Sequence, residues 1–144
     1  MDPRWRRIGL TLAWLAFAAI CICAALQLDA RQTRAEGEIE ELFRAGRSDV
    51  LVEGQGTVAR VLSDDRRGSK HQRLLVRLAS GHSVLISHNI DLAPRVENIT
   101  PGDSIAFRGE YAWNDKGGVV HWTHHDPDGR HPGGWLKHDG QTYR

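Results

Sequence analysis

Cysteine is scarce in this sequence of 144 residues. Only two cysteines are present, Cys21 and Cys23, and both fall within one apolar stretch near the N-terminus. The chain beyond that stretch therefore has neither a disulfide framework nor a catalytic thiol. A domain formed by that part of the chain must be stabilised by its core alone.

A bias of charge and the common catalytic signatures are missing as well. The formal net charge is +1 at pH 7, and basic and acidic side chains are equal in number from residue 31 onward. Bulk charge therefore predicts no polyanion partner, so any such partner must be recognised by a local cluster. The sequence has no phosphate-cradling P-loop and no Gly-x-Ser-x-Gly elbow, and the Gly-x-Gly at 54–56 precedes no predicted helix.

The first feature that is present is an uncharged run from Ile8 to Leu26, preceded by three arginines. As a helix this run is roughly 28 Å long, close to the hydrocarbon thickness of a bilayer. It predicts a cytoplasmic stub and a single transmembrane signal-anchor over residues 1–30, because the three arginines before the run outweigh the two that follow it. The remainder is then periplasmic, or secreted if the run is a cleaved signal peptide, which its poor cleavage pattern disfavours.

Residues 31–49 have the pattern of a short amphipathic helix. Ile39, Leu42 and Phe43 recur at helical spacing, and Gly46 is placed to end the helix. This helix either packs under the following domain or serves as a stalk.

Residues 50–144 change to short alternating runs, which indicate a mainly β domain with a tail rich in Gly and Pro. A small hairpin is expected around Asp139-Gly140. Five strands are predicted, over residues 57–63, 72–79, 83–88, 104–113 and 119–125.

Five short strands of this spacing predict a small OB-like barrel. One segment departs from the OB pattern, in which a helix usually lies between the third and fourth strands. Residues 90–101, IDLAPRVENITP, contain two prolines and leave room for little more than a turn. An SH3-like barrel is the alternative.

Several long motifs carry a resemblance to a known family. They are DDRRGSKHQRLLVRL, SHNIDLAPR, GEYAWNDKGGVVHWTHHDP and GGWLKHDGQTYR. Together they resemble a family of small exported or membrane-anchored bacterial proteins, known only as a domain of unknown function, over roughly residues 54–144. The resemblance implies a location at the bacterial inner membrane and brings no activity with it.

Five of the eight histidines fall within residues 121–140. In a straight strand, His121 and His125 lie about 13 Å apart, too far for one metal ion whose bonds to nitrogen are near 2 Å. A divalent metal would therefore need further ligands, and the candidate set is His88, Asp91, His121 and Asp126. His131 and His138 lie among Gly and Pro, which predicts solvated loop residues. The candidate acid–base residues are His71, His88, His121 and His125.

His88 has two interpretations. It lies at the end of a predicted strand, before Asn89 and Asp91, where the three side chains can bind a metal or position a water. Alternatively, His88 and Asn89 tie down the following loop by hydrogen bonds to its backbone, and Asp91 caps the next turn.

A basic cluster and several aromatic rings form a second candidate site. The loop between the first two strands and the NDKGG loop line the usual ligand face of an OB barrel. Basic side chains beside flat rings suit single-stranded nucleic acid or another sugar-phosphate polymer, although core packing is the alternative for the rings. The candidate ligand-binding residues are Arg66, Arg67, Lys70, Arg73, Asn89, Trp113 and Trp122.

Three functions follow from these observations. The first is a membrane-anchored binding module for nucleic acid or another anionic ligand, which we place first because it needs the fewest coincidences. The second is a metal-dependent phosphodiesterase or nuclease. The third is haem or metal handling at the envelope, because WLKHDGQTY is similar to a stretch of the haem chaperone of cytochrome c maturation. That similarity implies His138 as a haem ligand, with Tyr143 one position farther from it than in that family.

Overall fold

The computed structural model describes residues 20–27 and 37–144. The helix at 20–27 and the body formed by 37–144 belong to separate compact units, so each is described by itself. Within these ranges no helix is long and apolar enough to cross a membrane. Most of the predicted anchor, residues 1–19, lies outside the described residues.

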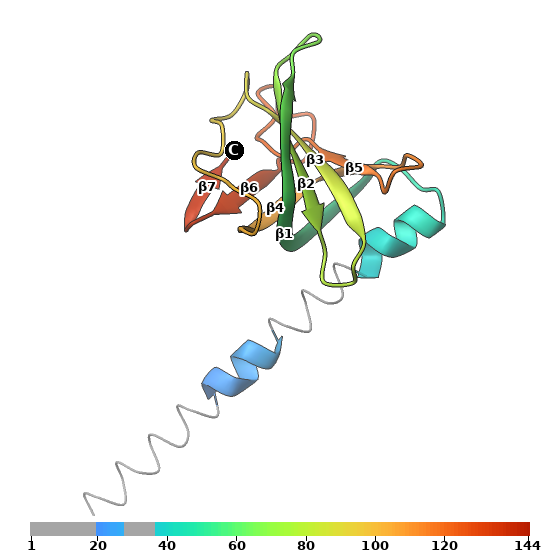
Figure 1. Cartoon of the computed structure of the whole chain (residues 1–144), viewed down its shortest axis with the longest axis vertical. Helices are drawn as coiled ribbons and strands as arrows, with labels where there is room; N and C mark the ends of the chain where they lie inside the picture. Colours follow the sequence, from blue (N-terminus) through green and yellow to red (C-terminus); the bar gives the residue numbers. More distant parts are fainter. Residues whose placement is uncertain (1–19, 28–36) are drawn as a thin grey trace, which may run out of the picture. The chain divides into compact units, whose positions relative to one another are not determined.

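The body consists of one short helix, 37–44, and seven strands in a single sheet (Figure 1). The strand order is β1-β2-β3-β5-β4-β6-β7, with an additional pairing of β1 with β4. The strands are β1 (Val50–Asp65), β2 (His71–Arg77), β3 (Ser83–Asn89), β4 (Ser104–Ala112), β5 (Val119–His121), β6 (Trp135–His138) and β7 (Gln141–Tyr143).

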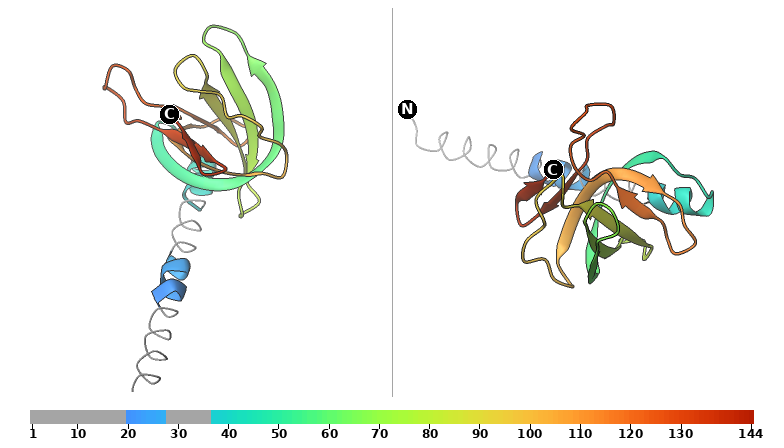
Figure 2. Two further views of the ribbon diagram at one scale, coloured as in Figure 1. Left: turned by 90° about the vertical axis from the view of Figure 1, so that its left-hand side faces the viewer. Right: turned by 90° about the horizontal axis from the view of Figure 1, so that it is seen from above.

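Five of these strands, β1, β2, β3, β5 and β4, close into a ring because β1 pairs at both of its ends. Its first half, from Val50 to Thr57, pairs with β4, and its second half pairs with β2. Figure 2 shows the strong curve of β1 that this double pairing requires. Gly56 lies in the curved part, where an added Cβ would lie 2.6 Å from the Arg77 carbonyl oxygen. The predicted strand over 57–63 therefore contains only the second half of β1.

The remaining ring pairings are antiparallel except for that of β3 with β5, which is parallel. The chain reaches β4 from β3 through residues 90–103. That segment forms turns and contains no helix, as its two prolines predict.

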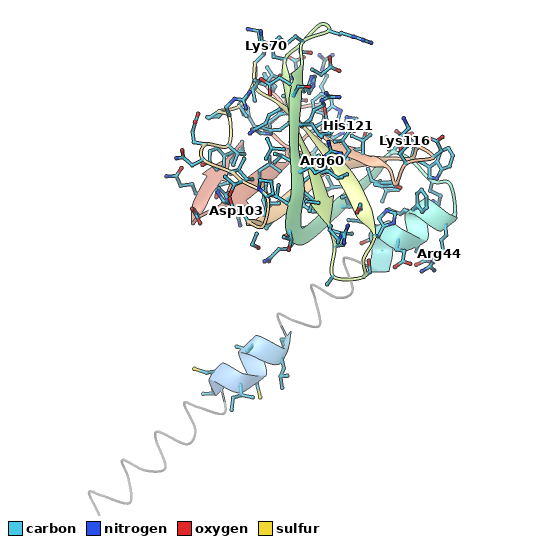
Figure 3. The ribbon with its side chains drawn as sticks, viewed as in Figure 1. Arg44, Arg60, Lys70, Asp103, Lys116 and His121 are labelled. Atoms are coloured by element: carbon cyan, nitrogen blue, oxygen red, sulfur yellow. The ribbon has the colours of Figure 1, made fainter. Side chains whose placement is uncertain are left out.

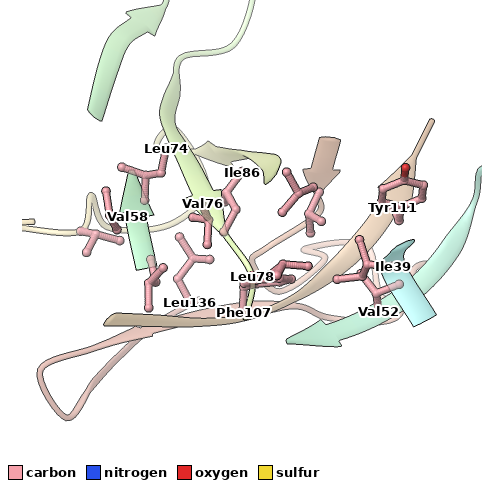
Figure 4. Packing of buried hydrophobic residues seen from close by; sticks show 14 of the residues in the cluster. Ile39, Val52, Val58, Leu74, Val76, Leu78, Ile86, Phe107, Tyr111 and Leu136 are labelled. Atoms are coloured by element: carbon pink, nitrogen blue, oxygen red, sulfur yellow. The ribbon is translucent and has the colours of Figure 1, made fainter. Parts of the chain in front are cut away.

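Side chains that alternate along the strands fill the centre of the ring (Figure 4). The helix at 37–44 contributes Ile39 and Leu42 to the same core, so it packs against the ring rather than serving as a stalk. Gly46, with a φ of 62°, ends the helix, as predicted. The N–H groups of Gly46 and Arg47 donate to the carbonyls of Phe43 and Leu42, which is the Schellman pattern.

Strands β5 and β6 lie along the same edge of β4, one after the other. β5 pairs with residues 110–112 of β4, and β6 pairs with residues 106–108, both in the antiparallel sense. They are thus two pieces of one strand line, separated by residues 122–134. We call this segment the interrupting loop, and it protrudes from the body of the ring in Figure 2.

The prediction of a fifth strand through His125 is wrong, because β5 ends at His121. Trp122 adopts a left-handed backbone conformation, with a φ of 54°, and so turns the chain out of the sheet. Alternation of residue types in VVHWTHH continues past this point, but the backbone does not follow it. The predicted hairpin is confirmed: Asp139 and Gly140 both have positive φ, as a type I′ turn between β6 and β7 requires.

Candidate functional site

The outer surface of β2 and β3 carries no carboxylate. Its outward positions alternate with the buried ones and comprise His71, Arg73, Leu75, Arg77, Ser83, Leu85, Ser87 and Asn89. Arg60 of β1 joins this surface because it pairs with Leu75. We define the basic face as these strand arginines with the cations of the β1–β2 loop; Figure 3 labels Arg60 and Lys70. The basic face thus comprises Arg60, Arg66, Arg67, Lys70, Arg73 and Arg77.

The acidic residues near the basic face are already engaged. Asp64 forms an ion pair with Arg95, and Asp65 accepts the backbone N–H of Arg67, which lowers the pKa of the Asp65 carboxyl. Asp91 accepts the backbone N–H of Lys70 and lies 3.8 Å from its ammonium.

Most cations of the basic face have no such partner. Arg60, Arg66, Arg67 and Arg77 form no ion pair within the part of the chain that the structure describes. Arg73 is held at the surface by its Nε, which donates to the Ser63 carbonyl at 2.8 Å. Most of the positive charge here is therefore available to a ligand.

The predicted aromatic rings lie elsewhere. The Trp113 ring donates from Nε1 to the Phe43 carbonyl at the end of the helix. Tyr111 is fully buried in the core, and Trp122 belongs to the interrupting loop. The strands of the basic face contain no Phe, Trp or Tyr. Any anion at this face is therefore bound by charge, without a stacking platform on those strands.

His88 is fully buried at the end of β3. Its Nε2 donates to the Pro94 carbonyl at 3.0 Å, so its Nδ1 accepts from the Thr123 hydroxyl at 2.8 Å. Burial lowers the pKa of the imidazole, which is thus held neutral. Asn89 accepts the backbone N–H of Asp91 at 3.0 Å. These hydrogen bonds agree with the second interpretation, in which His88 and Asn89 tie down the following loop. They occupy both ring nitrogens of His88.

The candidate metal ligands are not brought together. Among residues 20–27 and 37–144, no three His, Cys, Asp or Glu side chains are arranged to hold a metal ion. His88 contacts Thr123, and Asp91 contacts Lys70. The Asp126 carboxylate accepts backbone N–H groups of its own loop, which lowers its pKa.

His121 meets a residue that the sequence analysis did not select, Glu110. Glu110 lies opposite His121 in the β4–β5 register. Its carboxylate is 3.4 Å from Nε2 of His121 and 2.8 Å from Nε2 of His131. The hydrogen bond to Glu110 raises the pKa of His131, whereas burial lowers that of His121. The β4–β5 register, had it been predicted, would have placed Glu110 beside His121. No local sequence pattern indicated that His131 also contacts Glu110.

His131 also fastens the interrupting loop. Its ring stacks on Trp122 with centroids 4.3 Å apart and planes 11° apart. The base of the loop is closed by Gly134, whose N–H donates to the His124 carbonyl at 2.8 Å. The prediction that His131 is a solvated loop residue is therefore wrong.

Comparison with protein families shows which family the chain belongs to. The model of a family described as a protein of unknown function, DUF3465, matches residues 20–144. The chain belongs to the DUF3465 family. No curated protein matches it. The match starts well before residue 54, so the DUF3465 family includes the helix that completes the core.

The other histidines of this DUF3465 protein occupy different settings. His138 is only 6% exposed, and its Nδ1 lies 3.3 Å from the Ser104 carbonyl, so the prediction of a solvated His138 is wrong. His71 donates from Nδ1 to the Ser69 carbonyl at the start of β2. His125 is exposed on the interrupting loop.

Proposed function

We propose that this DUF3465 protein is a binding module for an anionic polymer, such as single-stranded nucleic acid, with the polymer on the basic face. The observation that carries the proposal is the set of cations along β1, β2 and their loop, most of which form no ion pair, while the neighbouring carboxylates are engaged by Arg95, by backbone N–H groups and by Lys70. Such a surface neutralises phosphates or similar groups and releases their counterions.

The architecture supports a finer proposal, that the five-strand ring is an OB-type barrel. Three features favour it: one long bent strand that pairs at both ends, closure of five strands, and a crossing that makes β3 and β5 parallel. In OB barrels the face of strands 2 and 3 and the loop between strands 1 and 2 bind oligonucleotides and oligosaccharides. The basic face lies on β2, the β1–β2 loop and the adjoining part of β1.

The location is part of the proposal. The uncharged run from Ile8 to Leu26 and the arginines before it favour a single anchor in the bacterial inner membrane with the domain in the periplasm. Its partner would then be an extracytoplasmic polyanion. The phosphodiesterase and haem alternatives lack a comparable observation, because no three candidate ligands gather among the described residues and His138 is buried.

The test is binding of labelled oligodeoxythymidylate to the full chain in detergent micelles, by fluorescence anisotropy over a salt series. Linear polyphosphate is titrated in parallel to separate nucleic acid from other polyanions. We expect the binding constant to fall steeply as salt rises. A variant with Arg60→Gln, Arg73→Gln and Arg77→Gln should reduce the slope of log K against log salt by about 2, at roughly 0.7 per contact with a single strand.

The matched control removes three cations outside the basic face, by Arg44→Gln, Arg47→Gln and Arg130→Gln. It should leave the slope within about 0.7, one contact, of the wild-type value. The proposal fails if neither polymer binds at low salt, or if the control weakens binding as much as the basic-face variant.

A further inference from the structure

A hollow of about 470 Å³ lies at the base of the interrupting loop. Its volume falls within the range of small-molecule sites, roughly 300–1,000 Å³. It opens on β4 and β6 and thus uses residues other than those of the basic face. The hollow is lined by Arg108, His125, Gly133, Gly134, Trp135 and Arg144.

The lining side chains include two guanidinium groups and an imidazole but no carboxylate. Arg108 forms no ion pair with any described residue. Glu53 lies beside it in the β1–β4 register, and even this carboxylate does not pair with it. The Arg108 guanidinium therefore keeps its fork of donors for an oxyanion, which it can bind with two parallel hydrogen bonds.

Trp135 provides a flat wall next to this cation, because it pairs with Arg108 across β4 and β6. The Lys137 ammonium lies over its ring, 4.2 Å from the centroid. Lys137 lines a smaller neighbouring hollow and not this one. Trp135 lines the larger hollow, so an aromatic ring borders the space beside Arg108.

The two adjacent glycines that line the hollow differ in whether the fold has room for a side chain. A Cβ on Gly134 would lie 2.0 Å from the Trp122 carbonyl oxygen, so only glycine fits there. A Cβ on Gly133 would meet nothing closer than the His125 Cα at 3.7 Å, and Gly133 does not have a positive φ. Neither packing nor backbone conformation thus requires glycine at position 133, where a side chain would instead occupy the hollow.

We propose that this hollow is a binding site for a small planar ring that carries a phosphate or carboxylate group. The ring stacks on Trp135, the oxyanion is held by the Arg108 guanidinium, and His125 lies at the rim on the exposed loop. The site is independent of the proposed polymer binding, because the two share no residue.

The experiment is isothermal titration of the full chain in detergent micelles with adenosine 5′-monophosphate, benzoate, adenosine and inorganic phosphate. We expect one of the two ring-bearing anions to bind at least tenfold more tightly than adenosine and phosphate. Binding of the first would indicate a phosphate ligand, and binding of the second a carboxylate ligand. Arg108→Gln should weaken that binding at least tenfold.

Matched variants distinguish the site from general effects. Gly133→Leu should abolish binding by filling the hollow, whereas Gly133→Ala should retain most of it, and circular dichroism of both verifies that they fold. The basic-face variant with Arg60→Gln, Arg73→Gln and Arg77→Gln should bind the small anion as the wild type does. The proposal is overturned if neither ring-bearing anion binds more tightly than adenosine and inorganic phosphate. It is also overturned if the Arg108→Gln variant binds the anion as well as the wild type does.

Discussion

The histidine-rich segment from His121 to His138 and the basic face use their polar side chains in opposite ways. In the segment, His121 and His131 contact Glu110, and His138 is buried beside the Ser104 carbonyl. On the basic face, the loop carboxylates are engaged and most of the cations are not. The polar side chains of the histidine-rich segment thus mainly form contacts that hold the fold together. The arginines of the basic face remain available for binding.

The difference teaches that a cluster of reactive residue types in a sequence is not yet a site. A side chain that satisfies a buried neighbour stabilises the fold and has no free lone pair or proton for a ligand. A side chain that the fold leaves without a partner retains its full capacity.

The largest effect is expected at the base of the interrupting loop, with Gly134→Ala. The added methyl would lie 2.0 Å from the Trp122 carbonyl oxygen and 2.4 Å from that of Arg108, so the backbone must shift. We expect a loss of about 3 kcal/mol or more in the free energy of unfolding, measured by urea denaturation. Gly133→Ala is the adjacent control and should change it by less than about 0.5 kcal/mol. Equal losses in the two variants would show that the loop is not closed at Gly134.

The second effect concerns His88. His88→Ala leaves a cavity and removes the partners of the Pro94 carbonyl and the Thr123 hydroxyl. We expect a loss of about 3 kcal/mol by the same measurement. His125→Ala is the control on an exposed histidine and should cost little. If the His88→Ala variant is instead as stable as the wild type but no longer binds the polyanion, His88 is a functional residue.

His88 also makes stability depend on pH. Burial lowers its pKa, so its neutral form is stabilising above the unfolded pKa near 6.5. Wild-type stability should therefore fall as the pH drops below about 6.5, and the His88→Ala variant should show a shallower decline. Parallel pH profiles of the two proteins would contradict this role.

A smaller effect of opposite sign is expected from His131. Its pKa is raised by Glu110, so the ion pair stabilises the loop fully below the unfolded pKa and is lost as the pH rises through the folded pKa. The cost of His131→Gln should be greater at pH 6 than at pH 8, by less than about 1 kcal/mol for a pair of which each side chain is 20% exposed. Urea denaturation at both pH values measures it, and a cost that is the same at both would exclude the ion pair.

The smallest effect on stability is expected at the basic face. Arg60 and Arg77 form no ion pair within the described residues, so Arg60→Gln with Arg77→Gln should change the free energy of unfolding by less than about 0.5 kcal/mol. Thermal melting monitored by circular dichroism checks this. A larger loss would mean that these arginines, too, are part of the fold.

Much of the fold was accessible from the sequence. Alternation located β2, β3 and β4, helical spacing put Ile39 and Leu42 on the apolar face of a helix, and Asp139-Gly140 marked the last hairpin. Local patterns did not show that β1 pairs on both sides or that the chain leaves the sheet at Trp122, because both depend on tertiary packing.

The candidate sites were less accessible. The basic loop was apparent as a charge cluster, but Arg60 and Arg77 join it only through strand register. Glu110 and His131 lie 21 residues apart in the sequence and meet only because the interrupting loop folds back. Arg108 and Trp135 become neighbours through the β4–β6 pairing. Sequence spacing carries no signal for any of these contacts.

The most direct test of the central claim is a thermal melt of two proteins, each with and without oligodeoxythymidylate. The proteins are the wild type and the variant with Arg60→Gln and Arg77→Gln. A ligand that binds only the folded state raises the melting temperature. If the fold leaves the arginines free for a polyanion, the two proteins melt together without the polymer and the wild type gains more stability with it than the variant does. Early melting of the variant alone, or an equal gain in both proteins, would contradict the claim.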